Sequence, residues 1–382
     1  MSLDGIRVLD LTRLLPGAYC TLLLADMGAD VVKVEEPTSG DYMRWYPPLH
    51  DGQSLLFNAL NRNKRSLTLN LKTEAGRDLF LALSEKADVV VEGNRPGVME
   101  RLGLGWPVLH ELNPKLVMCA ITGYGQSGPL SQRAGHDLNY MAIAGALSLN
   151  ARSGEAPHPL AVQVADIGGG GQAAATAILG ALLSVARGSD GRYLDVSMTD
   201  GAFSWLAVPF AQVRAQGPVQ RGMHRLTGRY ACYGVYECAD GRYVSVGALE
   251  PKFWRALCEA LNRHDLIDDQ YAEGGAQERL RAALSSVFAT RTRDEWTQAL
   301  GGLEACCEPV LELDEVAEHP QIRARGLVVE QPTGVEIAPA VRLRSDWRRG
   351  GPPRLGENTA EVLAEVGVEA ARLQELRAVG IV

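Results

Sequence analysis

Residues 134–140 (AGHDLNY) place a histidine and an aspartate in front of an alanine-rich helical pattern. Histidine is the only side chain whose ordinary pKa lies near neutrality, so His136 could both give and take a proton. Asp137 directly follows it, where a loop is expected to become a helix. A histidine at such a position can also simply cap or pack a helix end, so His136 alone does not identify a reaction.

Asp166 forms a second candidate site, because it precedes four consecutive glycines at Gly168–Gly171 and another helical pattern. Glycines allow close backbone approach, and free N–H groups at a helix start stabilise anions. The oxygen of a developing enolate is such an anion, so the amides near Gly168–Gly170 are expected to bind it. Asp166 could instead be an ordinary N-cap. The glycine run lacks the G-x-G-x-x-G spacing of dinucleotide-binding loops, which argues against NAD.

Two basic clusters could bind phosphate groups. Residues 61–66 carry Arg62, Lys64 and Arg65 before a strand pattern, and Arg95 and Arg101 flank the start of a helical pattern. In a chain with a net charge of −8, such local positive charge favours contact with an anionic ligand. A solvated charged loop is the alternative for either cluster.

The bulk composition describes a globular protein of more than one domain. The chain has 382 residues, of which 46% are hydrophobic and 22% charged. Its acidic balance argues against a nucleic-acid-binding protein, whose contact face is normally basic. The seven cysteines show neither a C-x-x-C pair nor zinc-ligand spacing, so we expect buried free thiols and no metal site.

The sequence shows no features that direct it to a membrane. The longest apolar run, Ala173–Ala186, is shorter than the roughly 20 residues that span a bilayer, and it is expected to form a core helix. The N-terminus has an acidic Asp4 and no separate apolar segment of the kind found in signal peptides. A cytoplasmic enzyme is therefore expected.

The first two-fifths of the chain alternate between strand and helix patterns. This alternation predicts βαβ units and a mostly parallel sheet, so the fold class is α/β. The expected helices cover Ala18–Met27 and Thr73–Lys86, with a further helix after Pro96. The expected strands are Ile6–Leu11, Asp30–Glu35, Ser66–Leu71, Asp88–Glu92 and Lys115–Ile121.

The pattern changes near Arg229. Strand patterns at Tyr230–Glu237 and Tyr243–Gly247 flank an Asp-Gly turn, which predicts a hairpin, and helical patterns continue to Leu300. We expect a large N-terminal domain over residues 1–200, a linker over 201–228 and a small α+β domain over 229–325. Residues 326–382 are expected to return to the large domain, with strands at Gly326–Glu330 and Val341–Leu343 and a helix from Glu357.

These residues together resemble CoA-transferase family III (the CaiB/BaiF-like proteins) and, within it, the α-methylacyl-CoA racemases. The likeness covers nearly the whole chain, and the order of the fragments makes it specific. The matching fragments are Val8–Leu11 with Pro16-Gly17, Leu24–Glu35, Asn61–Ser66, Arg95–Gly97, Thr122–Gly125, Val164–Gly170, Asp195–Gly201, Gly247–Glu250, Ala324–Gly326 and Leu355–Thr359.

The resemblance assigns roles to four site residues. Transferases of this family typically carry a tyrosine at the position of His136, whereas racemases carry histidine. Asp166 matches an aspartate that is a covalent nucleophile in transferases and an acid/base in racemases. Glu250 matches a glutamate that supports the catalytic histidine, and Asp137 is its neighbour in the motif. At Glu36 the chain departs from the racemases, which often carry an arginine there, and one phosphate contact is thereby in doubt.

The resemblance also implies an architecture. The large domain is expected to be Rossmann-like and built from both ends of the chain, with the smaller α+β domain in between. Two chains are expected to form an interlocked homodimer whose active sites lie between the large domain of one chain and the small domain of the other. CoA enters as part of the substrate, and no further cofactor or metal is implied.

The reaction implied is racemisation of 2-methylacyl-CoA thioesters. The thioester lets the α-proton leave because the negative charge spreads onto the carbonyl oxygen. Inversion then needs two bases on opposite faces, to which we assign His136 and Asp166, with Glu250 and Asp137 orienting the imidazole. Two alternatives stay open: a family III CoA-transferase with Asp166 as covalent nucleophile, and a non-catalytic CoA-binding protein.

Overall fold

The computed structural model describes residues 3–218, 220–331, 334–343 and 345–382. The chain divides into two compact units. The first unit contains residues 1–144, 160–205 and 321–382, and the second contains residues 145–159 and 206–320. The second unit thus includes α9 (Ala207–Gln216), which lies in the expected linker. It also includes residues 145–159, which lie within the expected large domain.

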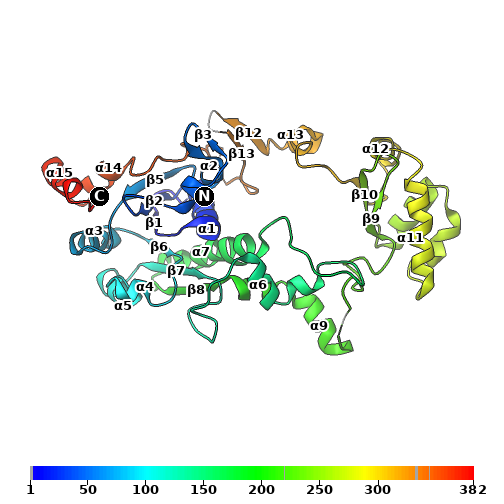
Figure 1. The fold of residues 1–382 in the computed structure, drawn as a ribbon, viewed down its shortest axis with the longest axis horizontal. Helices are drawn as coiled ribbons and strands as arrows, with labels where there is room; N and C mark the ends of the chain where they lie inside the picture. Colours follow the sequence, from blue (N-terminus) through cyan, green and yellow to red (C-terminus); the bar gives the residue numbers. More distant parts are fainter. Residues whose placement is uncertain (1–2, 219, 332–333, 344) are drawn as a thin grey trace. The chain divides into compact units, whose positions relative to one another are not determined.

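The first unit is built on a six-stranded, all-parallel sheet, which confirms the α/β fold class (Figure 1). The strand order is β5-β2-β1-β6-β7-β8, and it reverses direction between β1 and β6. Ligands of such sheets bind outside the carboxyl ends of the strands at this reversal. The strands are β1 (Arg7–Asp10), β2 (Asp30–Glu35), β5 (Lys64–Thr68), β6 (Val89–Glu92), β7 (Val117–Thr122) and β8 (Tyr193–Ser197).

One face of this sheet packs against helices from both ends of the chain. Leu363 and Leu376 of the C-terminal helices share a buried core with Leu9 of β1 and Phe80, and Figure 1 shows α14 beside β5. The expected return of the tail to the large domain is confirmed. The helices on this face are α3 (Glu74–Glu85), α4 (Val98–Arg101), α5 (Trp106–Leu112), α14 (Thr359–Ala364) and α15 (Ala370–Ala378).

The other face packs against α1 (Leu14–Asp26), a π-helix η3 (Ala165–Gln172), α7 (Ala173–Ala186) and α8 (Met198–Ser204). Helix α1 begins at Leu14 rather than at the expected Ala18, because Pro16 falls in the first turn, where a missing N–H costs nothing. A Cβ atom on Gly170 would lie 3.4 Å from Ile121 Cγ2, so η3 lies directly on β7.

Helices η3 and α7 are continuous over Ala165–Ala186, a 22-residue stretch. Among the described residues it is the single helix long and apolar enough to cross a membrane, contrary to the expectation that none would be. The difference arises because the glycine run is itself helical and lengthens the apolar segment. Gly168–Gly171 are buried against α1 and α8, which is also how a core helix packs.

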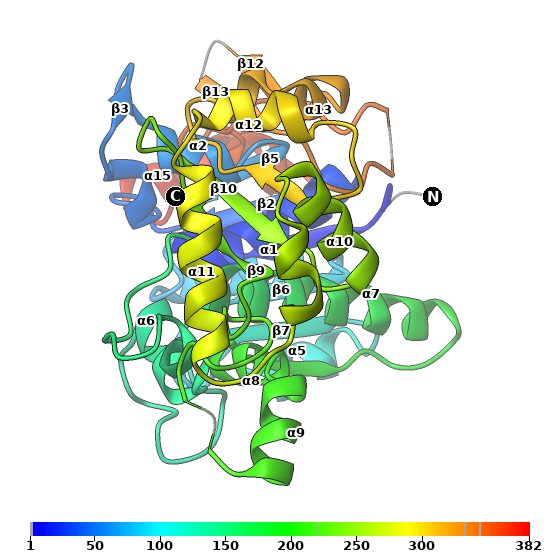
Figure 2. The same ribbon diagram turned by 90° about the vertical axis from the view of Figure 1, so that its right-hand side faces the viewer.

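The second unit is a three-stranded antiparallel sheet with helices packed on it (Figure 2). The expected hairpin is confirmed, with Tyr243 opposite Glu237 across the turn. Trp254, Phe288 and Trp296 fill the core between sheet and helices. The elements are β9 (Tyr233–Glu237), β10 (Tyr243–Gly247), β11 (Cys307–Pro309), α10 (Pro251–Ala260), α11 (Gly275–Phe288) and α12 (Arg293–Leu300).

Two expectations for the C-terminal region were wrong. Val341–Leu343 is not a strand; the partner of β12 (Val328–Gln331) is β13 (Gly334–Ile337), which pairs with it in the antiparallel direction. The expected single helix from Glu357 is interrupted at Gly367, whose positive φ of 83° ends α14 before α15 begins. The seven cysteines are free, and five of them are buried, as expected.

Candidate active site

His136 stands at the start of α6 (Asp137–Ile143) as its N-cap residue. Its backbone N–H donates to Asn139 Oδ1 at 3.1 Å, and its carbonyl accepts from the Asn139 N–H at 2.8 Å. This reciprocal pairing fixes the backbone at the beginning of the helix. The residue itself is exposed, so a substrate can reach its imidazole.

Asp137 connects the start of α6 to the start of η3. Its Oδ1 accepts hydrogen bonds from the backbone N–H groups of Ala165 at 2.7 Å and Asp166 at 3.0 Å. The starts of these two helices, which are distant in sequence, are thereby held together, with His136 at the start of one and Asp166 at the start of the other. These bonds position Asp166, and the expected orientation of the His136 imidazole by Asp137 stays a prediction.

Asp166 is half-buried in the first turn of η3. Burial raises the pKa of its carboxyl to about 7, and the nearby negative charge of Asp137 contributes to the shift. A carboxyl with this pKa gives and takes protons at neutral pH at little cost in free energy. The N-cap of η3 is Val164, so Asp166 is not the N-cap that the sequence offered as an alternative.

The glycines after Asp166 provide close packing. A Cβ atom on Gly169 would lie 2.8 Å from the Met198 carbonyl oxygen, and one on Gly168 would lie 1.9 Å from the Trp205 ring. Inside a π-helix the backbone N–H groups donate to carbonyls five residues earlier. The N–H groups of Gly169 and Gly170 are therefore engaged in η3, which leaves these two groups unavailable to an enolate oxygen.

Asn139 and Tyr140 were not singled out from the sequence, although both belong to the same motif. The Tyr140 hydroxyl donates to the Gly135 carbonyl, immediately before His136, and its ring meets Tyr124 edge-on. An amide side chain three residues after a helix N-cap is a known capping pattern and could have identified Asn139. No comparable sequence signal marks Tyr140, whose role depends on a fold-back contact.

Glu250 lies in the second unit as the N-cap residue of α10, and its carbonyl accepts from the N–H groups of Phe253 and Trp254. Burial and then the negative charge of Glu250 raise the pKa of the Cys306 thiol. Cys306 and Gly247 both line a large cavity of this unit. Glu250 follows Gly247, the last residue of β10, by three positions in the sequence.

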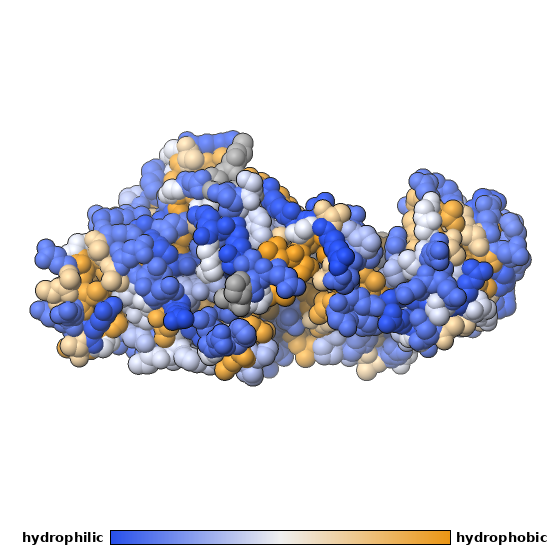
Figure 3. Space-filling model, turned by 90° about the horizontal axis from the view of Figure 1, so that it is seen from above, coloured by the Kyte–Doolittle hydropathy of each residue, from blue (hydrophilic) through white to orange (hydrophobic). Residues whose placement is uncertain are grey.

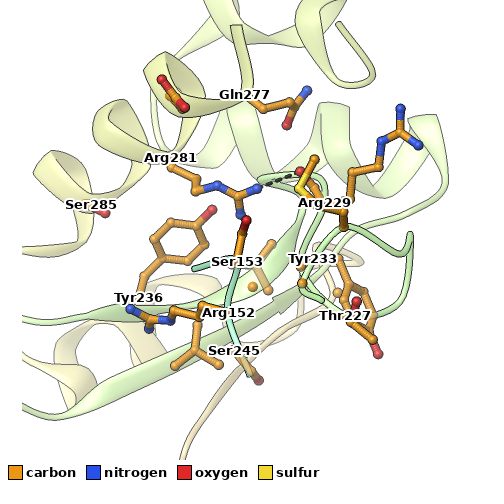
Figure 4. A pocket seen from close by; sticks show the side chains of 18 of the residues that line it. Arg152, Ser153, Thr227, Arg229, Tyr233, Tyr236, Ser245, Gln277, Arg281 and Ser285 are labelled. Carbon is orange, nitrogen blue, oxygen red and sulfur yellow. Dashed lines mark hydrogen bonds between the residues drawn. The ribbon is translucent and has the colours of Figure 1, made fainter. Parts of the chain in front are cut away.

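The cavity of the second unit has a volume of about 1330 Å³ and a mixed polar and aromatic lining (Figure 4). The Arg281 guanidinium lies beside the Tyr236 ring and donates to the Arg229 carbonyl. Arg229 is itself paired with Glu273 at 2.8 Å. The lining thus offers hydrogen-bond donors and acceptors rather than a purely apolar surface.

The basic residues at 62–65 have partners within the protein. Arg62 is buried and pairs with Asp26, and Lys64 is buried, which lowers its pKa to about 8. The Arg65 guanidinium contacts three carboxylates, those of Asp30, Glu361 and Glu365. Removing Arg62 would leave the buried Asp26 carboxylate without its cationic partner, whereas Asp30 and Glu365 are also paired with Arg7.

Arg95 and Arg101 differ from that first cluster. Both are exposed near the start of α4, and neither guanidinium forms a hydrogen bond or ion pair within the described part of the chain. They follow β6, beside the reversal of strand order. This placement favours these two arginines as phosphate contacts over the buried Arg62 and Lys64.

Glu36 stabilises the turn that follows β2. Its Oε2 accepts from the backbone N–H groups and the hydroxyls of Thr38 and Ser39, and these bonds lower the pKa of Glu36 to about 2. Among the described residues, no group of three or more His, Cys, Asp or Glu side chains is placed to hold a metal ion.

Comparison with known proteins places the chain in a family. The profile of CoA-transferase family III matches residues 3–359. The chain is 35% identical to the α-methylacyl-CoA racemase of Homo sapiens, over 98% of this chain and 96% of that protein. It is 36% identical to the racemase of Mus musculus, over 100% and 98%. It is 31% identical to the succinyl-CoA:glutarate CoA-transferase of Homo sapiens, over 100% and 90%.

The fold is similar to that of solved structures. A CaiB/BaiF family protein from Brucella suis superimposes with a TM-score of 0.83 and 31% identity, over 95% of this chain and 99% of that one. A protein from Mycobacterium tuberculosis superimposes with a TM-score of 0.80 and 32% identity, over 94% and 98%. The chain belongs to CoA-transferase family III.

Proposed function

We propose that the protein racemises 2-methylacyl-CoA thioesters by removing and returning the α-proton. The observation that carries the proposal is the pairing of two proton-transfer groups at adjoining helix starts. Asp166 has a pKa of about 7, and the accessible His136 stands at the start of the helix whose Asp137 binds the Asp166 backbone. The likeness to two mammalian racemases over the full chain also supports it.

In this mechanism one group removes the α-proton and the other returns a proton to the opposite face. The two groups exchange roles with the configuration of the substrate, so one must start protonated and the other not. An aspartate that titrates near neutrality meets both requirements, because it is present in both forms at the working pH. Glu250 is assigned the orientation of the His136 imidazole, and the thioester of CoA supplies the acidity of the α-carbon.

The second candidate function is CoA transfer, which the similarity to succinyl-CoA:glutarate CoA-transferases favours. There Asp166 would attack the thioester carbonyl, first forming a mixed anhydride and then an aspartyl thioester. A raised pKa lowers the fraction of ionised Asp166 available for attack at neutral pH, whereas it suits proton transfer. A CoA-binding protein without catalysis is the third candidate, and the acid–base pair would have no use in it.

We further propose that the enzyme is a cytoplasmic, interlocked homodimer that uses no cofactor beyond the CoA of its substrate. Proton transfer requires no redox group. Apolar side chains reach the surface of the first unit at Ile143, Val162 and Trp205, each more than half exposed, and Figure 3 shows apolar patches among polar surface. A second chain would bury such residues. Light scattering at low concentration tests this, and a compact, active monomer would contradict it.

The reaction is tested in heavy water with a 2-methylacyl-CoA and without any acceptor acid. The proposal predicts that the wild-type enzyme incorporates deuterium at the α-carbon and inverts the configuration of that carbon. A CoA-transferase would leave the α-proton in place under these conditions. Turnover only after an acceptor acid is added, with no exchange before it, would establish the second candidate function instead.

A further inference from the structure

Tyr140 occupies the interior of the motif that carries His136. The residue is 7% exposed, and its hydroxyl donates to the carbonyl of Gly135. Gly135 is joined to His136 by the next peptide bond, so this contact acts on the backbone that carries the imidazole. The hydrogen bond runs from the first turn of α6 back to the loop that precedes the helix.

The ring of Tyr140 fits a slot that two glycines leave open. A Cβ atom on Gly123 would lie 2.3 Å from Tyr140 Cε1, and one on Gly135 would lie 2.7 Å from the same atom. The ring of Tyr124 closes the slot edge-on, with 5.1 Å between the ring centroids. The tyrosine is thereby held in one orientation, and its hydroxyl cannot leave the Gly135 carbonyl without moving the ring.

Tyr140 also lies close to the acid–base pair. Burial raises the pKa of its phenol to about 12, and the negative charges of Asp166 and Asp137 add to the rise. The hydroxyl therefore keeps its proton at every pH at which the enzyme would work, and it remains a hydrogen-bond donor.

We propose that Tyr140 is a positioning residue for His136, through the hydrogen bond from its hydroxyl to the Gly135 carbonyl. The proposal rests on the proposed racemase function. Two bonds at Asn139 fix the N–H and carbonyl of His136, and the bond from Tyr140 fixes the residue before it. The direction of the imidazole into the substrate site then depends on the hydroxyl. Asp166 depends instead on the two bonds from Asp137.

The test compares Tyr140→Phe with Tyr124→Phe, using α-proton exchange in heavy water on each enantiomer separately. Tyr140→Phe removes the hydroxyl and keeps the ring in its slot. Tyr124→Phe removes the hydroxyl of the neighbouring ring, which forms no hydrogen bond within the described residues and so provides the matched control. A displaced catalytic group can cost up to roughly a hundredfold in rate, and we expect a loss of about tenfold or more.

The expected loss is asymmetric. Exchange from the enantiomer whose proton His136 removes should fall in Tyr140→Phe, with KM nearly unchanged, while exchange through Asp166 and all rates of Tyr124→Phe stay close to wild type. Equal loss for both enantiomers together with a lowered Tm would show a merely structural role and overturn the proposal. Wild-type rates for both enantiomers in Tyr140→Phe would also overturn it. Absence of exchange in the wild-type enzyme would instead contradict the racemase function itself.

Discussion

The Asp137 carboxylate accepts a hydrogen bond from the backbone N–H of Asp166 at 3.0 Å, so the residue that fixes Asp166 also places a negative charge beside it. One contact therefore sets both the position and the proton affinity of the carboxyl. The charge opposes ionisation of Asp166 and adds to the effect of burial.

Replacing Asp137 by asparagine separates these two effects, because an amide oxygen can accept the same backbone hydrogen bonds without the charge. The pKa of Asp166 should fall below 7, towards the ordinary value for aspartate. Whether Asp166 acts as base or as acid, the corresponding limb of the pH profile of kcat/KM should move to lower pH. A limb that stays in place would show that Asp137 does not set the proton affinity of Asp166.

The same raised pKa predicts how stability depends on pH. The folded protein binds a proton at Asp166 up to about pH 7, whereas the unfolded chain releases it near 3.8, the ordinary pKa of an aspartate. Asp166 therefore stabilises the fold fully below pH 3.8, and this stabilisation is lost as pH rises towards 7. Asp166→Asn should be more stable than wild type at pH 8.5, by about 2 kcal/mol, and should lose that advantage at pH 4. Thermal unfolding of both proteins at the two pH values measures this, and a constant difference in Tm would contradict it.

The basic residues should divide into two classes. Arg101→Glu should raise the KM for acyl-CoA by roughly tenfold with little change in kcat or Tm, because the guanidinium is exposed and without an ion-pair partner among the described residues. Arg62→Met should lower stability by about 3 kcal/mol, because it leaves the buried Asp26 carboxylate unpaired. Kinetics and urea unfolding of both variants test the division. A normal KM in Arg101→Glu would remove that residue from the phosphate site.

The contact between η3 and α8 should tolerate no added methyl group. A Cβ atom on Gly201 would lie 2.2 Å from the Gly169 carbonyl oxygen, so Gly201→Ala should separate the helices and cost roughly 3 kcal/mol. Gly180→Ala, in the middle of α7 with no atom within 4 Å of the added carbon, is the control and should stabilise by about 1 kcal/mol. Similar midpoints of unfolding for the two variants would contradict the packing argument.

The sequence predicts the parallel sheet and the hairpin because both are encoded locally. Valine-rich stretches such as Val89–Val91 are fully buried strands, and the Asp240-Gly241 turn joins the two strands of the hairpin. The strand expected at Val341–Leu343 was wrong because a short apolar pattern does not specify its pairing partner. The expected strand at Gly326–Glu330 does form, as β12 (Val328–Gln331), but it pairs with Gly334–Ile337, which the sequence did not single out.

The candidate site likewise combines residues that the local sequence indicates with contacts between distant segments that it does not. The types and neighbours of His136 and Asp166 indicate them as candidates from the sequence alone. The hydrogen bonds from Ala165 and Asp166 to Asp137 join residues 28 and 29 positions apart, and the fold-back of Tyr140 onto Gly135 depends on how the loop packs. The internal partners of Arg62 and Arg65, which lie in distant segments, could not be read from a local charge cluster.

The most direct test of the two-base mechanism is α-proton exchange by His136→Ala and Asp166→Ala on each enantiomer in heavy water. Both variants should lose racemisation, because inversion uses both groups. Each should still exchange the α-proton of the enantiomer that faces its surviving base, with retention of configuration. The two variants should therefore lose exchange with opposite enantiomers. Exchange of the same enantiomer by both variants would show that His136 and Asp166 do not flank the substrate, and an acyl adduct of Asp166 trapped by hydroxylamine during turnover would establish CoA transfer instead.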